Sequence, residues 1–194
     1  SYREVNLDNK YFYEVMDQSE EIPTSSQPSI DELLDVFKSI VKSGDNVVGV
    51  FLSSDMSGTY SSAHLAKNMV LEEYPDARIE IIDSRTNCMQ MGFQVIEGAR
   101  AAKEGKSIEE VVEVVNNVVK SSRFLFVPDT LRYLKKGGRI GGAAALFGTI
   151  LQIRPILTVR DGVTSVFEKV RTKKKAVNAI VDKVLDDIKN YGLG

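Results

Sequence analysis

Residues 46–63 read NVVGVFLSSDMSGTYSSA, a short apolar run followed by a loop of serine, glycine and threonine. An apolar run of this length is typical of a strand that is buried on both faces of a parallel sheet. We expect the polar loop to leave the end of this strand and a helix to run from about Thr59 to Glu73. Because parallel strands are joined through crossover helices, this strand–loop–helix unit indicates an α/β fold.

The same pattern recurs directly downstream. Residues 77–82 read as a second strand, residues 83–87 as a second polar loop, and a helix is expected to continue to about Lys103. Two capping boxes, in which Ser or Thr is followed three residues later by Glu, predict the starts of further helices. They are Ser29 with Glu32 and Ser107 with Glu110. We therefore expect a parallel-sheet domain over residues 1–120.

The pattern changes after residue 120. Asp161-Gly162 is a strong signal for a two-residue hairpin turn and predicts an antiparallel pair of strands. The expected elements are strands at 123–127, 155–159 and 163–170, and helices at 131–136, 143–150 and 173–189. We expect residues 121–194 to form part of a second α/β domain with mixed or antiparallel strands.

Composition excludes several classes of function. The net charge is −2 and the pI is near 5.6, which argues against a protein that binds nucleic acid. His64 and Cys88 are the single histidine and cysteine, so the usual zinc sites are excluded and no metal or cofactor is expected. One cysteine suits a reducing cytoplasm, where we expect the protein to act. No run of apolar residues is long enough to span a bilayer.

The two polar loops are the candidate ligand site. Ser57 and Thr59 offer hydroxyls where a helix begins, and Gly58 between them lets a ligand approach the backbone. Asn87 and Cys88 stand at the corresponding place in the second loop. Helix N-termini favour anions, and ligands of open α/β sheets bind outside the carboxyl ends of the strands. The alternative is ordinary helix capping by short polar side chains.

Two later segments are also unusual. Residues 137–145 contain four glycines and three alanines, so they can pack closely against another backbone or against a long apolar ligand. The alternative is a helix C-cap with favourable terminal cations, followed by a tightly packed helix. Residues 171–175 read RTKKK, which is either a solvated charged face or a surface that docks an acidic partner.

These stretches together resemble the DegV family of bacterial fatty-acid-binding proteins. The matching stretches are TSSQPS (24–29), SSDMSGTYSSA (53–63), IDSRTNCMQMG (82–92), DTLRYLKKGGRIGGAAALFGTILQIRPIL (129–157) and VFEKVRTKKKA (166–176). The resemblance implies a two-domain protein that buries a long acyl chain between its domains. We expect the protein to be a monomer. It also implies a fatty-acid kinase as partner, which phosphorylates the carboxylate that the DegV-like protein presents.

The resemblance also implies roles for individual residues. Thr59 matches the carboxylate-binding threonine of the SGTY motif, and Cys88 falls where the family commonly has a serine. A thiol is a weaker donor than a hydroxyl. We therefore expect either that Asn87 or a backbone N–H takes this role, or that the contact with the head group is weaker. Arg139 is expected near the ligand channel, and Arg171 is expected to dock the kinase. The side chains expected to line the acyl-chain pocket are Phe51, Met56, Met89, Phe93, Leu146, Phe147 and Ile150.

The family's N-terminal strand with its D-S-T loop is expected to precede Ser1, and its second domain to continue beyond Gly194 with a histidine near the head group. Two other functions stay open. The first is an enzyme acting on a small anionic substrate at the same loops, either a phosphotransferase or a hydrolase that uses Ser57 with His64. The second is a scaffold without a ligand.

Overall fold

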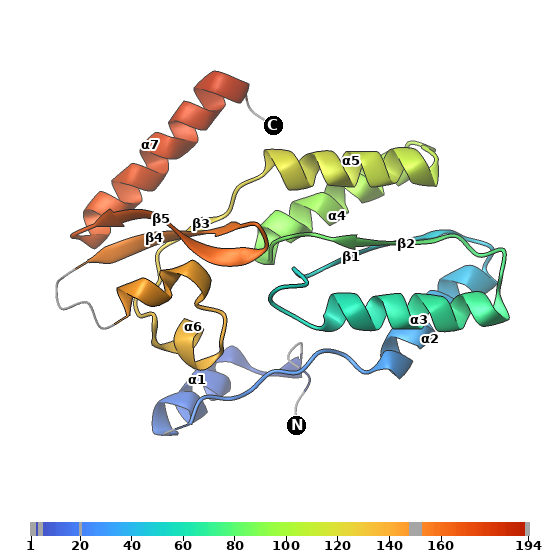
Figure 1. Ribbon diagram of the computed structural model, residues 1–194, viewed down its shortest axis with the longest axis horizontal. Coiled ribbons are helices and arrows are strands. Elements are labelled where there is room, and N and C mark those ends of the chain that lie inside the picture. The colour runs from blue at the N-terminus through green and yellow to red at the C-terminus, as the bar shows by residue number, and fades with distance from the viewer. Residues whose placement is uncertain (1–2, 4–5, 20, 148–152, 193–194) are drawn as a thin grey trace.

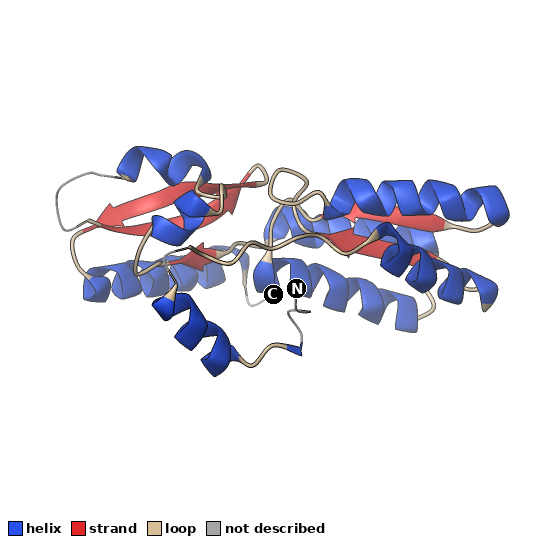
Figure 2. Ribbon diagram, turned by 90° about the horizontal axis from the view of Figure 1, so that it is seen from below, coloured by secondary structure: helices blue, strands red, loops and turns tan. Residues whose placement is uncertain are grey.

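The computed structural model describes residues 3, 6–19, 21–147 and 153–192. Two sheets lie end to end along the longest axis of the molecule, and helices cover both of them (Figures 1 and 2). The first sheet is parallel and two-stranded, and the second is antiparallel and three-stranded. The expected α/β class, with a parallel sheet first and antiparallel strands after it, is therefore confirmed.

The parallel sheet consists of β1 (Val47–Phe51) and β2 (Ile79–Asp83), which run in register from Val47 opposite Ile79 to Phe51 opposite Asp83. Helices lie on both sides of it (Figure 1). They are α2 (Ile30–Lys42) and α3 (Thr59–Glu73) on one side, and α4 (Cys88–Lys103) and α5 (Ile108–Ser121) on the other. Apolar side chains of α2, α3 and both strands form one buried core, which includes Phe37, Val70 and Ile79.

Local signals determine where these helices begin and end. In both predicted capping boxes the serine hydroxyl accepts from the glutamate N–H, while the glutamate carboxylate accepts from the serine N–H. Such a cap contributes about 1 kcal/mol to helix stability. Gly44 and Gly105 follow the ends of α2 and α4 with φ of +83° and +82°, in the left-handed region that favours glycine.

The antiparallel sheet has the order β3–β4–β5. Its strands are β3 (Leu125–Phe126), β4 (Arg154–Arg160) and β5 (Val163–Val170). The long helix α7 (Lys173–Tyr191) lies on one side, and α6 (Arg132–Lys136) with the 3₁₀ helix η2 (Gly141–Leu146) lies on the other (Figure 1). The turn residues Asp161 and Gly162 both have positive φ, 51° and 82°, as a type I′ hairpin turn requires.

The sequence predicts a helix over residues 143–150, and this prediction is wrong within the described part of the range. The structure has a 3₁₀ helix over Gly141–Leu146, and Phe147 is already extended. The reason is close packing against β5, since a Cβ on Gly141 would collide with the backbone of Thr164. Close packing against another backbone therefore accounts for the glycine at position 141. Residue 150, assigned to the pocket from the sequence, lies outside the described residues.

The first helix, α1 (Asn9–Gln18), begins at the cap Asp8 and has no buried residue. It lies apart from both sheets, below α6 in Figure 1. Within the described ranges, no helix is long and apolar enough to cross a membrane.

Candidate functional site

The two polar loops meet at the carboxyl ends of β1 and β2. Ser84 N donates to Phe51 O at 3.0 Å, and Ser53 N donates to Thr86 O at 2.9 Å. These two hydrogen bonds continue the strand pairing into the loops, so the starts of α3 and α4 open on the same edge of the sheet. This edge is where open α/β sheets bind their ligands.

The first loop brings two hydroxyls together at the start of α3. Ser57 Oγ and Thr59 Oγ1 are hydrogen-bonded at 2.8 Å, and Thr59 N donates to Ser57 Oγ at 3.3 Å. Both side chains are half-buried. The cap residue of the helix is Gly58, which has no side chain to offer to the first N–H groups. A carboxylate at this point would meet hydroxyl donors and a helix N-terminus together.

Gln27 contacts this loop from the extended segment that precedes α2. Its Nε2 donates to Ser62 Oγ at 2.5 Å, and its side chain lies so close to Gly58 that a Cβ there would collide with it. The TSSQPS stretch predicted no role for Gln27. A side chain at position 58 would displace the Gln27 amide, although any residue can adopt the φ of −71° found there.

The second loop is fixed by internal hydrogen bonds. Ser84 and Thr86 are almost fully buried. Ser84 Oγ donates to Thr86 O at 3.0 Å, and the buried Gln94 donates from Nε2 to Ser84 O at 3.2 Å. These hydroxyl and amide groups therefore make hydrogen bonds within the loop. The residues at the end of the loop are the ones that can contact a ligand.

Asn87 and Cys88 stand at the end of the second loop. Asn87 caps α4 by position, and its Nδ2 lies 3.5 Å from Met56 Sδ in the first loop. Its Oδ1 is buried and has no hydrogen-bond partner among the described residues. Cys88 is exposed and has a φ of 50°. The two residues thus lie beside the first loop, with the amide facing Met56.

Arg139 contacts the first polar loop from the part of the chain that contains the antiparallel sheet. Its Nε donates to Met56 O at 3.0 Å, although the residue lies in the segment that joins α6 to η2. The guanidinium therefore bridges the antiparallel unit and the loop after β1. Among the residues named from the sequence, Asn87 and Arg139 both contact Met56, which directly precedes Ser57 in the chain.

The other side chains assigned to the acyl-chain pocket range from exposed to buried. Met89 and Phe93 are 56% and 52% exposed and are four residues apart, so they share one face of α4. The Lys135 ammonium nitrogen lies over the Phe147 ring, 3.7 Å from the centroid of the ring. Phe51 packs against the core of the parallel unit, and Leu146 is buried in η2.

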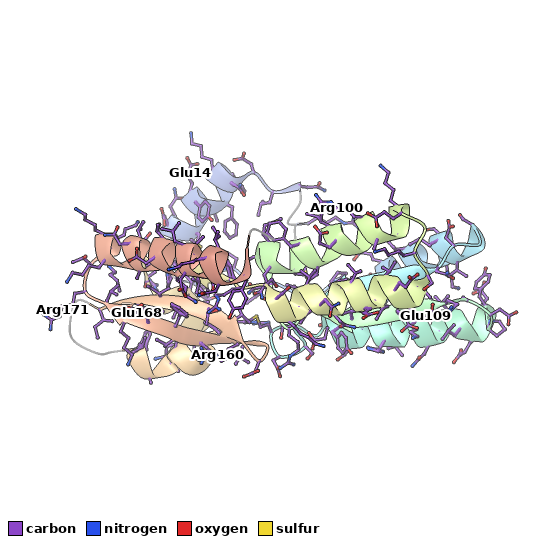
Figure 3. The ribbon with its side chains drawn as sticks, turned by 90° about the horizontal axis from the view of Figure 1, so that it is seen from above. Glu14, Arg100, Glu109, Arg160, Glu168 and Arg171 are labelled. Atoms are coloured by element: carbon purple, nitrogen blue, oxygen red, sulfur yellow. The ribbon has the colours of Figure 1, made fainter. Side chains whose placement is uncertain are left out.

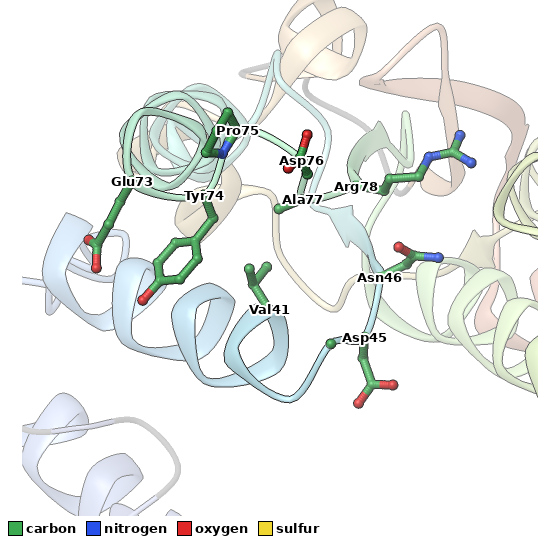
Figure 4. A pocket seen from close by; sticks show the side chains of 10 residues that line it. Val41, Asp45, Asn46, Glu73, Tyr74, Pro75, Asp76, Ala77 and Arg78 are labelled. Atoms are coloured by element: carbon green, nitrogen blue, oxygen red, sulfur yellow. The ribbon is translucent and has the colours of Figure 1, made fainter.

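A groove of about 350 Å³ lies at the other end of the parallel sheet, where the strands begin (Figure 4). Charged and polar groups including Asp45, Asn46 and Arg78 line it together with Tyr74 and Pro75. None of the side chains assigned to the acyl chain from the sequence contributes to it.

Arg171 is exposed between β5 and α7. It lies at the outer end of the antiparallel sheet, whereas Arg160 lies toward the parallel unit (Figure 3). Arg171 is therefore remote from the two polar loops.

The serine–histidine pair of the hydrolase alternative is not assembled. The His64 ring packs edge-on against Tyr60, with 4.6 Å between ring centroids, and the Ser57 hydroxyl is paired with Thr59. No hydrogen bond joins His64 to Ser57 or Ser61, all three of which the structure describes.

Comparison with known proteins identifies the family. The model of the DegV family of uncharacterised proteins matches residues 1–193. The chain belongs to the DegV family. A DegV domain-containing protein of Clostridium acetobutylicum is 57% identical over 194 residues, which are all of this chain and 68% of the relative. The resemblance seen in the sequence is thus confirmed.

Solved structures of fatty-acid-binding proteins share the fold. The stearic-acid-binding protein of Eubacterium ventriosum superposes with a TM-score of 0.85 at 31% identity, over 96% of this chain and 64% of that one. DegV of Bacillus subtilis, a fatty-acid-binding protein, superposes with a TM-score of 0.83 at 35% identity, over 96% and 65%. The chain therefore spans about two thirds of the length of the DegV proteins that it matches.

Proposed function

We propose that this DegV-family chain binds a long-chain fatty acid and is not an enzyme. The observation that carries the proposal is the pairing of the Ser57 and Thr59 hydroxyls at the start of α3, at the edge where the loops after β1 and β2 meet. Two solved structures with the same fold are those of fatty-acid-binding proteins, and they support the choice of ligand.

In this proposal the carboxylate binds at the two loops. Thr59 and Ser57 donate hydroxyl hydrogen bonds, Gly58 admits the ligand to the helix N-terminus, and Asn87 and Cys88 contact it from the second loop. The carboxylate orients the ligand at the surface, because charge-assisted hydrogen bonds to fixed donors are directional.

The acyl tail extends from these loops between a parallel domain, residues 1–120, and a second domain, residues 121–194. Met56, Met89, Phe93 and Phe147 line its path in this proposal, and Arg139 flanks it. Each buried methylene contributes about 0.8 kcal/mol, so a tail of about 16 carbons contributes on the order of 12 kcal/mol before the costs of binding. The tail therefore supplies most of the affinity, and the loops supply orientation.

We further propose that the bound carboxylate is presented to a fatty-acid kinase, which converts it to an acyl phosphate. Residues 121–194 carry 14 Lys and Arg against six Asp and Glu, so this part of the chain suits an acidic partner surface. Arg171 is the docking residue in this proposal, and its distance from the loops leaves the carboxylate accessible to the kinase.

Lipid extraction tests the binding proposal. The purified protein is denatured, extracted with organic solvent and analysed by mass spectrometry, beside Thr59→Ala and Thr59→Ser variants. We expect stoichiometric fatty acid from the wild type and from Thr59→Ser, which keeps the hydroxyl, and clearly less from Thr59→Ala. A folded wild type that takes up no fatty acid, even when supplied with it, would overturn the proposal.

A further inference from the structure

We infer that the β4–β5 hairpin turn, Asp161-Gly162, is a positioning element that holds the loop after β1 in the shape that binds a carboxylate. The inference rests on the proposed function and adds a specificity-determining contact to it. The turn belongs to the antiparallel sheet, but it extends to the carboxyl ends of the parallel strands (Figure 1).

Two side chains of the polar loops donate to the carbonyl groups of this turn. Ser53 Oγ donates to Gly162 O at 2.7 Å, and the Arg85 guanidinium donates to Asp161 O. Ser53 is completely buried, so its hydroxyl is committed to this contact. One donor comes from each loop, and the hairpin turn therefore joins the two loops to each other.

Ser53 transmits this contact to the Ser57–Thr59 pair. Its carbonyl accepts from Ser57 N at 3.0 Å and from Met56 N at 2.9 Å, and its N–H donates to the second loop. Ser53 thus begins a tight turn that ends at Ser57, one of the residues proposed to bind the carboxylate. A shift of Ser53 would move Ser57 with it.

Arg85 is a cation beside the proposed anion site, yet its charge is already committed. Its Nη1 pairs with Asp55 Oδ2 at 2.8 Å and with Asp83 Oδ2 at 3.5 Å. Together with the donation to Asp161, these pairs orient the guanidinium toward the hairpin. Arg85 therefore positions the two loops. The carboxylate is bound by the hydroxyls and by the helix N-terminus.

Gly162 lies so close to the loop side chains that a Cβ at this position would displace them. A Cβ at this position would lie 2.6 Å from Asp55 Oδ2 and 2.7 Å from both Arg85 Cζ and Ser53 Oγ. Gly105 has the same φ of +82°, but a Cβ there would meet nothing within 4 Å. Alanine therefore introduces the same backbone strain at both positions, and a collision with the loop residues only at position 162.

The affinities of the intact protein for palmitate and for hexadecanol distinguish a loss of loop positioning from a general loss of stability. The two ligands have equal tails, and only palmitate carries a carboxylate. For the wild type we expect a clear preference for palmitate. For Gly162→Ala we expect palmitate affinity to fall about tenfold, which corresponds to about 1.4 kcal/mol, while hexadecanol affinity changes little. Gly105→Ala should keep the wild-type preference at a lower melting temperature.

A second variant covers the case in which Gly162→Ala does not fold. Ser53→Ala removes the donor to Gly162 without a collision, and we expect it to reduce the preference for palmitate as well. A Gly162→Ala or Ser53→Ala protein that keeps the wild-type preference, or that loses both ligands equally, would overturn the inference alone. A wild type that binds neither ligand would overturn the proposed function and the inference with it.

Discussion

Arg139 Nε donates to Met56 O at 3.0 Å, and this hydrogen bond ties the glycine-rich segment of the antiparallel unit to the loop after β1. We expect Arg139→Ala to weaken palmitate binding about fivefold, or about 1 kcal/mol, because one hydrogen bond that holds the loop is lost. Isothermal titration calorimetry measures the change. Arg132→Ala removes the same charge from neighbouring α6 and serves as the control. Equal losses in both variants would mean that charge, and not the contact with Met56, is responsible.

Gln27 and Gly58 should be energetically coupled. Gly58→Ala places a methyl group against Gln27 and forces that side chain away, so its hydrogen bond to Ser62 is lost. We expect a cost of about 1 kcal/mol in the free energy of unfolding, measured with urea. In a Gln27→Ala background the same substitution should cost clearly less, since the side chain that it displaces is absent. Additive costs would contradict the contact.

The capping box at the start of α5 should make stability depend on pH. Glu110 accepts from Ser107 N at 2.7 Å, and this hydrogen bond lowers the pKa of the carboxyl group. The stabilisation is present above the ordinary carboxyl value of about 4.3 and is lost as the pH falls through the lower pKa of the folded state. Glu110→Gln should therefore lower the melting temperature more at pH 7 than at pH 3.

Glu113→Gln is the matched control for this experiment, because it makes the same exchange on an exposed position of the same helix. A Glu110→Gln protein whose melting temperature falls by the same amount at both pH values would show that the negative charge has no role in the cap.

Docking of the kinase should depend on Arg171 and not on the ligand site. At limiting concentrations of the carrier, we expect Arg171→Glu to lower the rate of acyl-phosphate formation about tenfold, because charges at an interface rim speed and orient encounter. The dissociation constant of palmitate should not change. Lys189→Glu makes the same charge reversal near the other end of α7 and should leave the rate close to that of the wild type. Equal rates for both variants would exclude Arg171 as the docking residue.

The elements of this fold could be predicted where the signal is local. The start of α3 at Thr59 follows from an apolar strand and a polar loop, and the capping box places Ser29 just before α2. Asp161-Gly162 marked the hairpin because both residues of a type I′ turn need positive φ. In each case the deciding interactions lie within a few residues along the chain.

Contacts between distant segments could not be predicted in the same way. Ser53 and Gly162 are separated by 109 residues, and their hydrogen bond depends on how the two sheets are placed. The 3₁₀ form of η2 has the same kind of cause, because the backbone of Thr164 approaches Gly141. Small residues alone did not distinguish an α-helix from this tighter turn. The roles of Gln27 and Arg85 were missed for the same reason.

The most direct test of the central claim is the ¹³C NMR spectrum of palmitate labelled at its carboxyl carbon and bound to the wild type, Thr59→Ser and Thr59→Ala proteins. If the carboxylate binds at the Ser57–Thr59 pair, the bound resonance is displaced from that of free palmitate, stays close to the wild-type position in Thr59→Ser, and moves in Thr59→Ala. A bound carboxyl resonance that is identical in all three proteins would contradict the account, because the carboxylate would then lie away from Thr59.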